Sequence, residues 1–314
     1  MTTSAPSTPA AYRSNPGSPG NALGYLAALG AYGSWGVAPL YFAALDFVGP
    51  WEMVAHRSIW TVVMLAGFLA IRRRLWTTVA LLGEWRTAGP LLVSTALIAT
   101  NWTVFVWSIQ NGYLHEASLG YFINPLFNVA LGVLFLKERL SRAQGIAVAL
   151  AAIGVGYELV ALGTVPWVAL VLVLSFGLYG LVRKTAPVDA TPGLFIETLI
   201  ASPVFLGILA WYAASGLGSF GPAMIGGGGL WVSLALVASG VVTGAPLIFF
   251  VVGARRLNLA IMGLMQYIAP SLQFLIAVFV LDEAFDPSIM VTFACIWAGL
   301  VVFSGDLVRR ARRG

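Results

Sequence analysis

Three ionisable residues stand close together in one apolar run, residues 50–71. Glu52 and His56 are four positions apart, so on a helix they share one face, while Arg57 lies on a flanking face. If the helix begins near Pro50, Arg57 lies about 10 Å into a bilayer, where a charge is costly unless it is paired or hydrated. We interpret the three side chains as lining a cavity, where they bind an anionic or polar solute or pass a proton. The alternative is a structural Glu52–Arg57 ion pair, with His56 bonded to a backbone carbonyl.

Glu197 is the one carboxylate in another apolar run, residues 192–213. An ionisable group inside a membrane-spanning segment usually serves function, so we predict a role for Glu197 in gating or proton coupling. Two other roles stay open: a buried uncharged carboxylate, and an interfacial group that caps a helix.

Two prolines, Pro125 and Pro270, stand near the beginnings of two further apolar runs. Proline removes a backbone donor, so each either breaks its helix and turns backbone groups toward a solute, which would give it a role in gating or coupling, or sits in a first turn and breaks nothing. Asn101 lies inside a third run, where an amide bonds a neighbouring helix or lines a path. Besides Asn101, we predict as cavity residues Trp35, Tyr121, Asn124, Tyr179, Gln266 and Tyr267.

The sequence lacks the common catalytic motifs. It has one Cys and two His, and it contains no HExxH, no Asp-rich diphosphate site and no GxxxxGK[ST]. We therefore expect no metal, no cofactor and no ATP hydrolysis, and we rank an intramembrane enzyme below a transporter.

The composition indicates a polytopic membrane protein. Of 314 residues, 59% are hydrophobic and 9% are charged, whereas a soluble globular protein carries about 25% charged residues. The net charge of +5 follows membrane topology rather than a nucleic-acid partner. Ten apolar runs are long enough to cross a bilayer as helices: residues 22–44, 50–71, 88–110, 115–136, 142–160, 165–184, 192–213, 229–253, 258–281 and 287–307.

The basic residues give the orientation. With ten crossings, sixteen of the 17 Lys and Arg residues fall on one side, and Arg57 is then the one cation outside a connection or tail. By the positive-inside rule this side is cytoplasmic and holds both termini. The other side carries the acids Asp46, Glu116, Glu158, Asp282, Glu283 and Asp286.

The chain also repeats itself. Residues 121–138 match residues 266–283 at an offset of 145. Each half has five spans, an odd number, so the halves enter the membrane from opposite sides. Inverted repeats are the usual frame of secondary transporters, with the substrate site between the halves. The matched pairs are Pro125 with Pro270, Glu138 with Glu283, Glu52 with Glu197 and, at an offset of 144, Trp35 with Tyr179.

Several strings resemble the RarD group, in the EamA branch of the drug/metabolite transporter superfamily. They are SWGVAPLYF (34–42), EMVAHRSIW (52–60), NWTVFVW (101–107), EASLGYFINPLFNVALGVLFLKERLS (116–141), LSFGLYGLVRK (174–184) and QYIAPSLQFL (266–275). The resemblance implies a ten-helix inner-membrane permease built as two inverted five-helix repeats. Asp282 departs from the family pattern, which has Gly before the Glu.

We therefore predict an all-α polytopic protein with ten transmembrane helices in two inverted repeats. The expected units are a disordered tail (1–20), a first repeat (21–160), a second repeat (161–308) and a basic cytoplasmic tail (309–314). The predicted function is secondary transport of a small organic metabolite or drug across the inner membrane by alternating access, either coupled to protons or not. An uncoupled channel or facilitator is the alternative. The expected partners are the solute, the lipid bilayer and, in the coupled version, protons.

Overall fold

The computed structural model describes residues 19–221, 229–280 and 289–311. Within these ranges the secondary structure is helical and contains no strand, which confirms the predicted all-α class. The predicted tail up to residue 18, the Asp282–Glu283 pair with Asp286, and residues 312–314 lie outside the described residues.

Five long helices come from the first half of the chain and five helical segments, one of them interrupted, from the second. The first five are α1 (Pro19–Ala43), α2 (Pro50–Ile71), α4 (Trp85–Gln110), α5 (Leu114–Phe135) and α6 (Arg142–Leu162). The others are α7 (Trp167–Thr185), α8 (Ala190–Ser215), α9 (Gly229–Arg256), α10 (Leu259–Gln266) with α11 (Ile268–Phe279), and α12 (Ile289–Ala311). Two short elements that the sequence did not predict, α3 (Leu75–Ala80) and the 3-10 turn η1 (Leu81–Gly83), join α2 to α4.

Nine segments of the described chain are long and apolar enough to cross a bilayer, with α10 and α11 counted as one. The tenth predicted span is α1, which has 25 residues and is not among the nine. Its Gly, Ser and Pro residues lower its apolar content, although it packs against α9 and α11 inside the same bundle.

Local sequence signals set several helix ends. Pro50 occupies the first turn of α2, where no helical partner is needed for the missing N–H. Ser141 and Gln144 form a reciprocal capping box at the start of α6. Gly163 and Gly216 end α6 and α8 with φ values of 67° and 68°, a conformation that favours glycine.

The outer surface of the bundle is apolar. Large side chains such as Leu134 and Val160 are 72% and 82% exposed, and many others on the outer faces are alike. A soluble monomer rarely exposes so much contiguous apolar surface, whereas a bilayer accepts it. Together with the nine apolar helices, this surface identifies a multi-pass membrane protein.

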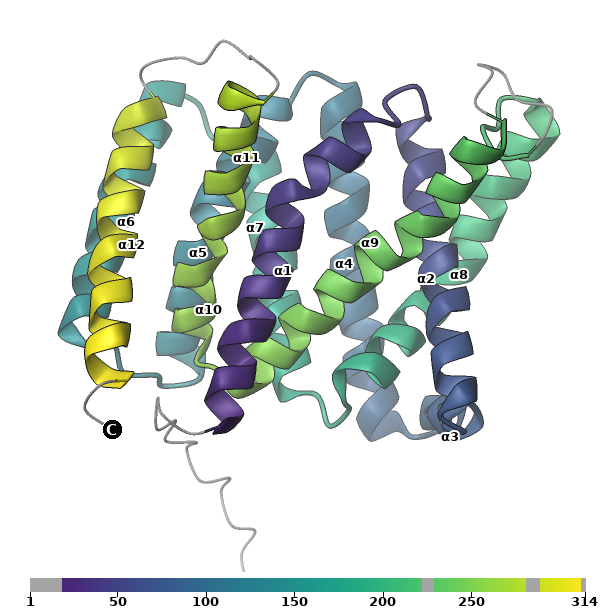
Figure 1. Ribbon diagram of the computed structural model, residues 1–314, viewed down its shortest axis with the longest axis horizontal. Coiled ribbons are helices and arrows are strands. Elements are labelled where there is room, and N and C mark those ends of the chain that lie inside the picture. The colour runs from purple at the N-terminus through teal and green to yellow at the C-terminus, as the bar shows by residue number, and fades with distance from the viewer. Residues whose placement is uncertain (1–18, 222–228, 281–288, 312–314) are drawn as a thin grey trace, which may run out of the picture.

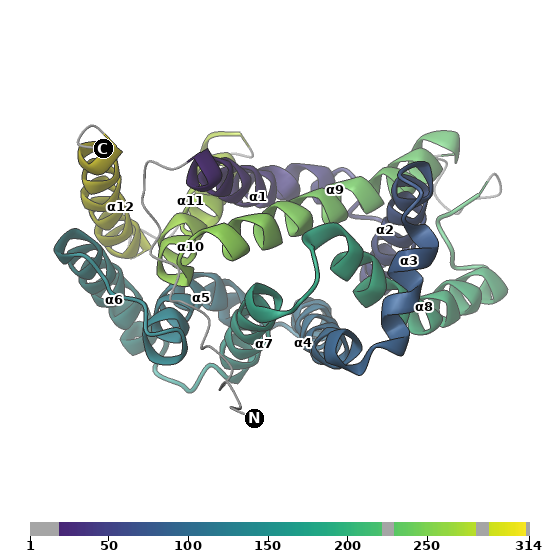
Figure 2. The ribbon, with the colours of Figure 1, turned by 90° about the horizontal axis from the view of Figure 1, so that it is seen from below.

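The helices pack in pairs that link the two halves of the chain (Figures 1 and 2). Three pairs join corresponding helices: α6 with α12, α5 with α10, and α2 with α8. Each of the other main contacts has a counterpart in which the two halves are exchanged. The contact of α1 with α9 corresponds to that of α4 with α7, the contact of α2 with α9 to that of α4 with α8, and the contact of α1 with α11 to that of α5 with α7. Exchanging the first five helices for the second five leaves this pattern unchanged.

One face of the bundle gathers several connections. In Figure 1, α1 begins and α12 ends on the same side, where α3 also lies. Lys184, at the end of α7, donates to the carbonyl of Ala254 at 2.6 Å, and Arg255 donates to the carbonyl of Ala186 at 2.9 Å. Glu138, just after α5, accepts from the amide of Leu259 at 2.8 Å. These bonds hold the α5–α6, α7–α8 and α9–α10 connections together.

The two prolines act differently. Helix α5 continues through Pro125 without a break. The other helix is interrupted at Tyr267, between α10 and α11. Pro270, three residues after Tyr267, lacks the N–H that would bond the carbonyl of Gln266. The Tyr267 side chain is buried and its hydroxyl donates to the carbonyl of Phe122 at 3.0 Å, which holds the interruption against α5.

Candidate functional site

A cavity of about 300 Å³ lies within the bundle. Its walls come from α1, α2, α4, α5, α7, α9, α10 and α11, so both halves of the chain contribute. This volume is at the lower end of the range for small-molecule sites. Seven residues predicted from the sequence are among those that line it: Trp35, Arg57, Asn101, Tyr121, Asn124, Gln266 and Pro270.

Arg57 brings a positive charge to this cavity. Its guanidinium carbon lies 4.9 Å from the centre of the Trp102 ring and 5.8 Å from that of Phe42. Its Nε is buried and has no hydrogen-bond partner. Cation–π contacts of this kind stabilise a charge only in part, so the guanidinium keeps capacity to bind a further group.

Glu52 and His56 are not among the residues that line this cavity. The Glu52 carboxylate accepts from the amide of Ser219 at 2.6 Å and lies 3.7 Å from His56 Nε2. The other nitrogen of His56, Nδ1, accepts from Trp60 at 3.3 Å, and the imidazole lies 5.0 Å from the Phe220 ring. The proposed Glu52–Arg57 pair is therefore absent from the structure. Glu52 instead joins α2 to the segment that follows α8.

Side-chain amides connect the cavity wall to neighbouring helices. Asn101 donates to the carbonyl of Leu172 at 2.9 Å and to Ser175 at 3.0 Å, which ties α4 to α7. Gln266 accepts from Asn128 at 2.8 Å, which ties α10 to α5. Asn101 thus does both things the sequence left open, since it bonds a neighbouring helix and also lines the cavity. Gln266, predicted as a cavity residue, likewise bonds a neighbouring helix while it lines the cavity.

Two further amides complete the polar lining. Gln273 donates to the carbonyl of Trp35 at 3.0 Å. Asn124 is buried, and its side-chain oxygen has no hydrogen-bond partner. A buried amide oxygen without a donor is costly, so Asn124 gives the cavity wall an unpaired acceptor.

The remaining predicted residues lie outside the lining of this cavity. Glu197 and Tyr179 border a smaller space of about 10 Å³, enough for about one water. Its walls share Ile98, Trp102 and Leu247 with the large cavity. The predicted residues outside the large cavity are Glu52, His56, Pro125, Tyr179, Glu197 and Tyr267.

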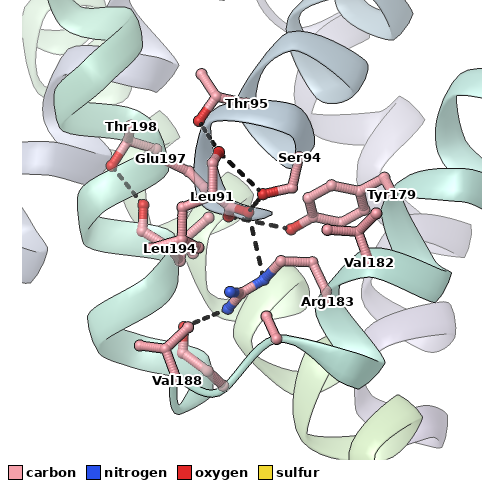
Figure 3. Close-up of polar contacts among 12 residues, drawn as sticks. Leu91, Ser94, Thr95, Tyr179, Val182, Arg183, Val188, Leu194, Glu197 and Thr198 are labelled. Carbon is pink, nitrogen blue, oxygen red and sulfur yellow. Dashed lines mark hydrogen bonds and ion pairs between the residues drawn. The ribbon is translucent and has the colours of Figure 1, made fainter. Parts of the chain in front are cut away.

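Glu197 is the centre of a buried polar cluster (Figure 3). Arg183 Nε lies 3.3 Å from one carboxylate oxygen, and Ser94 donates to the same oxygen. The Tyr179 hydroxyl lies 3.5 Å from the other oxygen. The cluster joins α4, α7 and α8, so Glu197 has a buried, charged partner and is not an interfacial helix cap.

Arg183 corrects the sequence interpretation. The sequence interpretation places it in a connection and leaves Arg57 as the one cation outside connections and tails. Arg183 instead belongs to the last turn of α7 and is fully buried. Its ion pair with Glu197 and its bond to the carbonyl of Ala190 at 3.2 Å offset the cost of burial.

The sequence contained a usable signal for this partner. Glu197 is buried and needs a counter-charge, and Arg183 and Lys184 are the cations nearest to it along the chain. Arg183 also lies four positions after Tyr179, on the same helical face. The part played by Ser94 had no such signal, because it comes from a helix far away in the sequence.

Comparison with known proteins gives consistent matches along the chain. A profile described as the EamA-like transporter family matches residues 22–157. A Vibrio cholerae protein described as an uncharacterized transporter is 47% identical over 296 residues, which cover 92% of this chain and 96% of that protein. Protein RarD of Streptomyces exfoliatus is 40% identical, with coverage of 92% and 90%, and Protein RarD of Escherichia coli (strain K12) is 41% identical, with coverage of 92% and 96%.

Solved structures match as well. A protein of known crystal structure superposes with a TM-score of 0.66 at 20% identity, over 91% of this chain and 97% of that chain. At this identity the match demonstrates a shared fold and nothing more.

Proposed function

Because this chain belongs to the EamA-like transporter family, within its RarD group, we propose that it is a secondary transporter of a small organic solute that works by alternating access. The cavity that both halves of the chain enclose is the observation that carries this proposal. A solute bound there touches both halves, and a relative movement of the halves would open it to either side in turn.

The packing supports an inverted repeat of residues 21–160 and 161–308. An inverted repeat requires each contact between the halves to have a counterpart when the halves are exchanged. The matched helix pairs meet this requirement, including α1 with α9 against α4 with α7. In this arrangement α1 is the tenth span, because it is the counterpart of α7.

The charges support an orientation in the inner membrane with both termini in the cytoplasm. The bonds of Lys184, Arg255 and Glu138 gather three of the basic connections on one face. The beginning of α1 and the end of α12 lie on that side too (Figure 1). A basic face is retained in the cytoplasm.

Two glutamates, matched by the repeat, are candidates for the gates at the two ends. Glu197, from the second half, accepts from Ser94 of the first half. Glu52, from the first half, accepts from Ser219 of the second half. Each bond joins the two halves, so alternating access would break one of them while the other remains.

The proposal has an uncoupled and a proton-coupled version. The coupled version needs a titratable group that responds to the solute, which we assign to Glu52, His56 or Glu197. Glu197 is the best placed, since the small space beside it shares a wall with the cavity. The uncoupled version needs no such group, and it is favoured by a described lining that contains neither carboxylate nor imidazole.

Transport in liposomes tests the proposal. Ligands found by thermal-shift screening of the purified protein should also exchange across liposomes that contain it, because a ligand of the native state raises apparent stability. Arg57→Ala should abolish this exchange while the protein remains folded in the membrane. Arg72→Ala changes an exposed arginine just after α2 and is the matched control. Exchange at the wild-type rate in Arg57→Ala would count against the cavity as the transport site.

A further inference from the structure

The described residues that line the cavity carry a positive charge and no negative charge. Among the described residues that line it, Arg57 is the one side chain with a full charge, and no Asp, Glu, Lys or His accompanies it. Two candidates for a counter-ion from the spanning helices have other partners. Glu52 is bonded to Ser219 and lies beside His56, and Glu197 is paired with Arg183.

Arg57 is therefore a buried cation without an anionic partner. The rings of Trp102 and Phe42 contact its guanidinium, and its Nε has no acceptor. A guanidinium binds a carboxylate through two parallel N–H···O bonds, which are stronger than bonds between neutral groups. The group that this site lacks is an anion that the solute brings with it.

Six aromatic side chains form part of the wall. Trp35, Phe105, Phe176 and Tyr121 line the cavity together with the two rings that contact Arg57. Such a wall accepts a flat apolar body. The volume of about 300 Å³ is at the lower end of the range for small-molecule sites, which suits a body of one or two rings.

We propose that the cavity selects an organic monoanion, a carboxylate carried on an aromatic body, and discriminates against amines and zwitterions. This inference rests on the proposed transport function and names the substrate class of that same site. An ammonium group in the cavity would lie near Arg57 and would find no carboxylate among the described lining residues. Repulsion by Arg57 and the lost hydration of the ammonium would both oppose its binding.

Four probes with one body separate charge from shape. Naphthylacetate carries a carboxylate, naphthylacetamide is neutral, naphthylethylamine is a cation and naphthylalanine is a zwitterion. Their binding to the purified protein is measured by calorimetry. We expect naphthylacetate to bind at least about tenfold more tightly than each of the other three. A hydrogen bond to a charged group is stronger than one between neutral groups, and this difference in binding free energy corresponds to about tenfold in the dissociation constant.

Variants at position 57 assign the preference to the guanidinium. Arg57→Gln should bring naphthylacetate and naphthylacetamide to within about threefold of each other, because the charge is gone. Arg57→Lys keeps the charge and should keep part of the preference, which covers the case in which Arg57→Gln fails to fold. Arg72→Gln, outside the cavity, should bind like the wild type.

The outcomes distinguish this inference from the transport function. Equal binding of amine and acid, an unchanged preference in folded Arg57→Gln, or binding of none of the four probes overturns the anion selectivity. Exchange of the probes across liposomes is measured separately. Tight binding of naphthylacetate without exchange supports the selectivity and contradicts transport, whereas exchange of the amine alone contradicts the selectivity and leaves transport standing.

Discussion

Gly193 offers a direct way to disturb the buried Arg183–Glu197 pair without removing either charge. A Cβ at Gly193 would collide with the Arg183 guanidinium. Because Arg183 is fully buried, its guanidinium must shift to make room for this Cβ, and the shift would disturb its ion pair with Glu197. Gly193→Ala should therefore separate the two charges inside the bundle.

The size of the effect follows from two opposing contributions. Breaking a buried ion pair costs about 3–5 kcal/mol. Replacing glycine by alanine within a helix stabilises it by about 1 kcal/mol. The free energy of unfolding should consequently fall by about 2–4 kcal/mol in Gly193→Ala.

Gly207 provides the matched control on the same helix, α8. A Cβ there would meet nothing within 4 Å, so Gly207→Ala should be neutral or stabilising by about 1 kcal/mol. Both variants are compared by titration with sodium dodecyl sulfate in mixed micelles, followed by circular dichroism. In a background of Arg183→Leu with Glu197→Leu, where no pair exists to break, Gly193→Ala should lose its cost.

Equal stabilities of Gly193→Ala and Gly207→Ala would refute this reasoning. So would an undiminished cost in the background without the pair, because the collision would then act through packing alone.

Three other expectations concern packing, membrane potential and protons. Gly240→Ala on α9 would press against the backbone of Trp60 on α2, because the added Cβ would lie 2.5 Å from the Trp60 carbonyl carbon. Such overpacking should lower the free energy of unfolding by about 1–3 kcal/mol. Equal stability of Gly240→Ala and the control Gly67→Ala would contradict this expectation. A monoanion that moves alone carries one charge across the membrane. At equilibrium, naphthylacetate should therefore accumulate outside liposomes by ~50-fold per 100 mV of inside-negative potential. Accumulation that does not depend on the potential would contradict uncoupled anion movement. At zero potential a pH gradient should distribute it as in protein-free liposomes, and gradient-driven accumulation beyond that of protein-free liposomes would instead support the coupled version, for which Glu197→Gln is the variant to measure.

The spans were predictable because length and apolar content are local properties. The predicted run 50–71 coincides with α2, and the run 229–253 ends three residues before α9 does. The short helix α3 was missed, because six residues between two spans are too few to show the length and apolar content that mark a span. The break in the second proline-containing helix falls at Tyr267, three residues before Pro270, because the proline acts on the carbonyl four positions earlier.

The candidate site was predictable in its residue types and less so in its geometry. Arg57 was found because a cation within an apolar run is rare. The sequence also indicated that Glu52 and His56 share a face that Arg57 does not. It could not tell which face meets the cavity, because that depends on the packing of α2 against α8 and α9.

Arg183 was missed for a different physical reason. Near the end of a span, a cation in the cytoplasmic connection and a cation buried in the last helical turn look alike in the sequence. The long side chain of Arg183 reaches Glu197 on the next helix, and this reach is a tertiary property. Charge counting therefore gave a consistent orientation even though it assigned this residue to the wrong environment.

The central claim is a cavity between the two halves that opens to each side in turn, and thiol labelling tests it most directly. In a Cys295→Ser background, Ala38→Cys places a thiol in the cavity wall, and Ala152→Cys places one on the exposed face of α6 as a control. A membrane-impermeant thiol reagent is added to right-side-out and to inverted vesicles. We expect it to label position 38 from both sides, to be blocked there by a bound ligand, and to leave position 152 unlabelled. Labelling of position 38 from neither side, or from one side alone under all conditions, would contradict alternating access through this cavity.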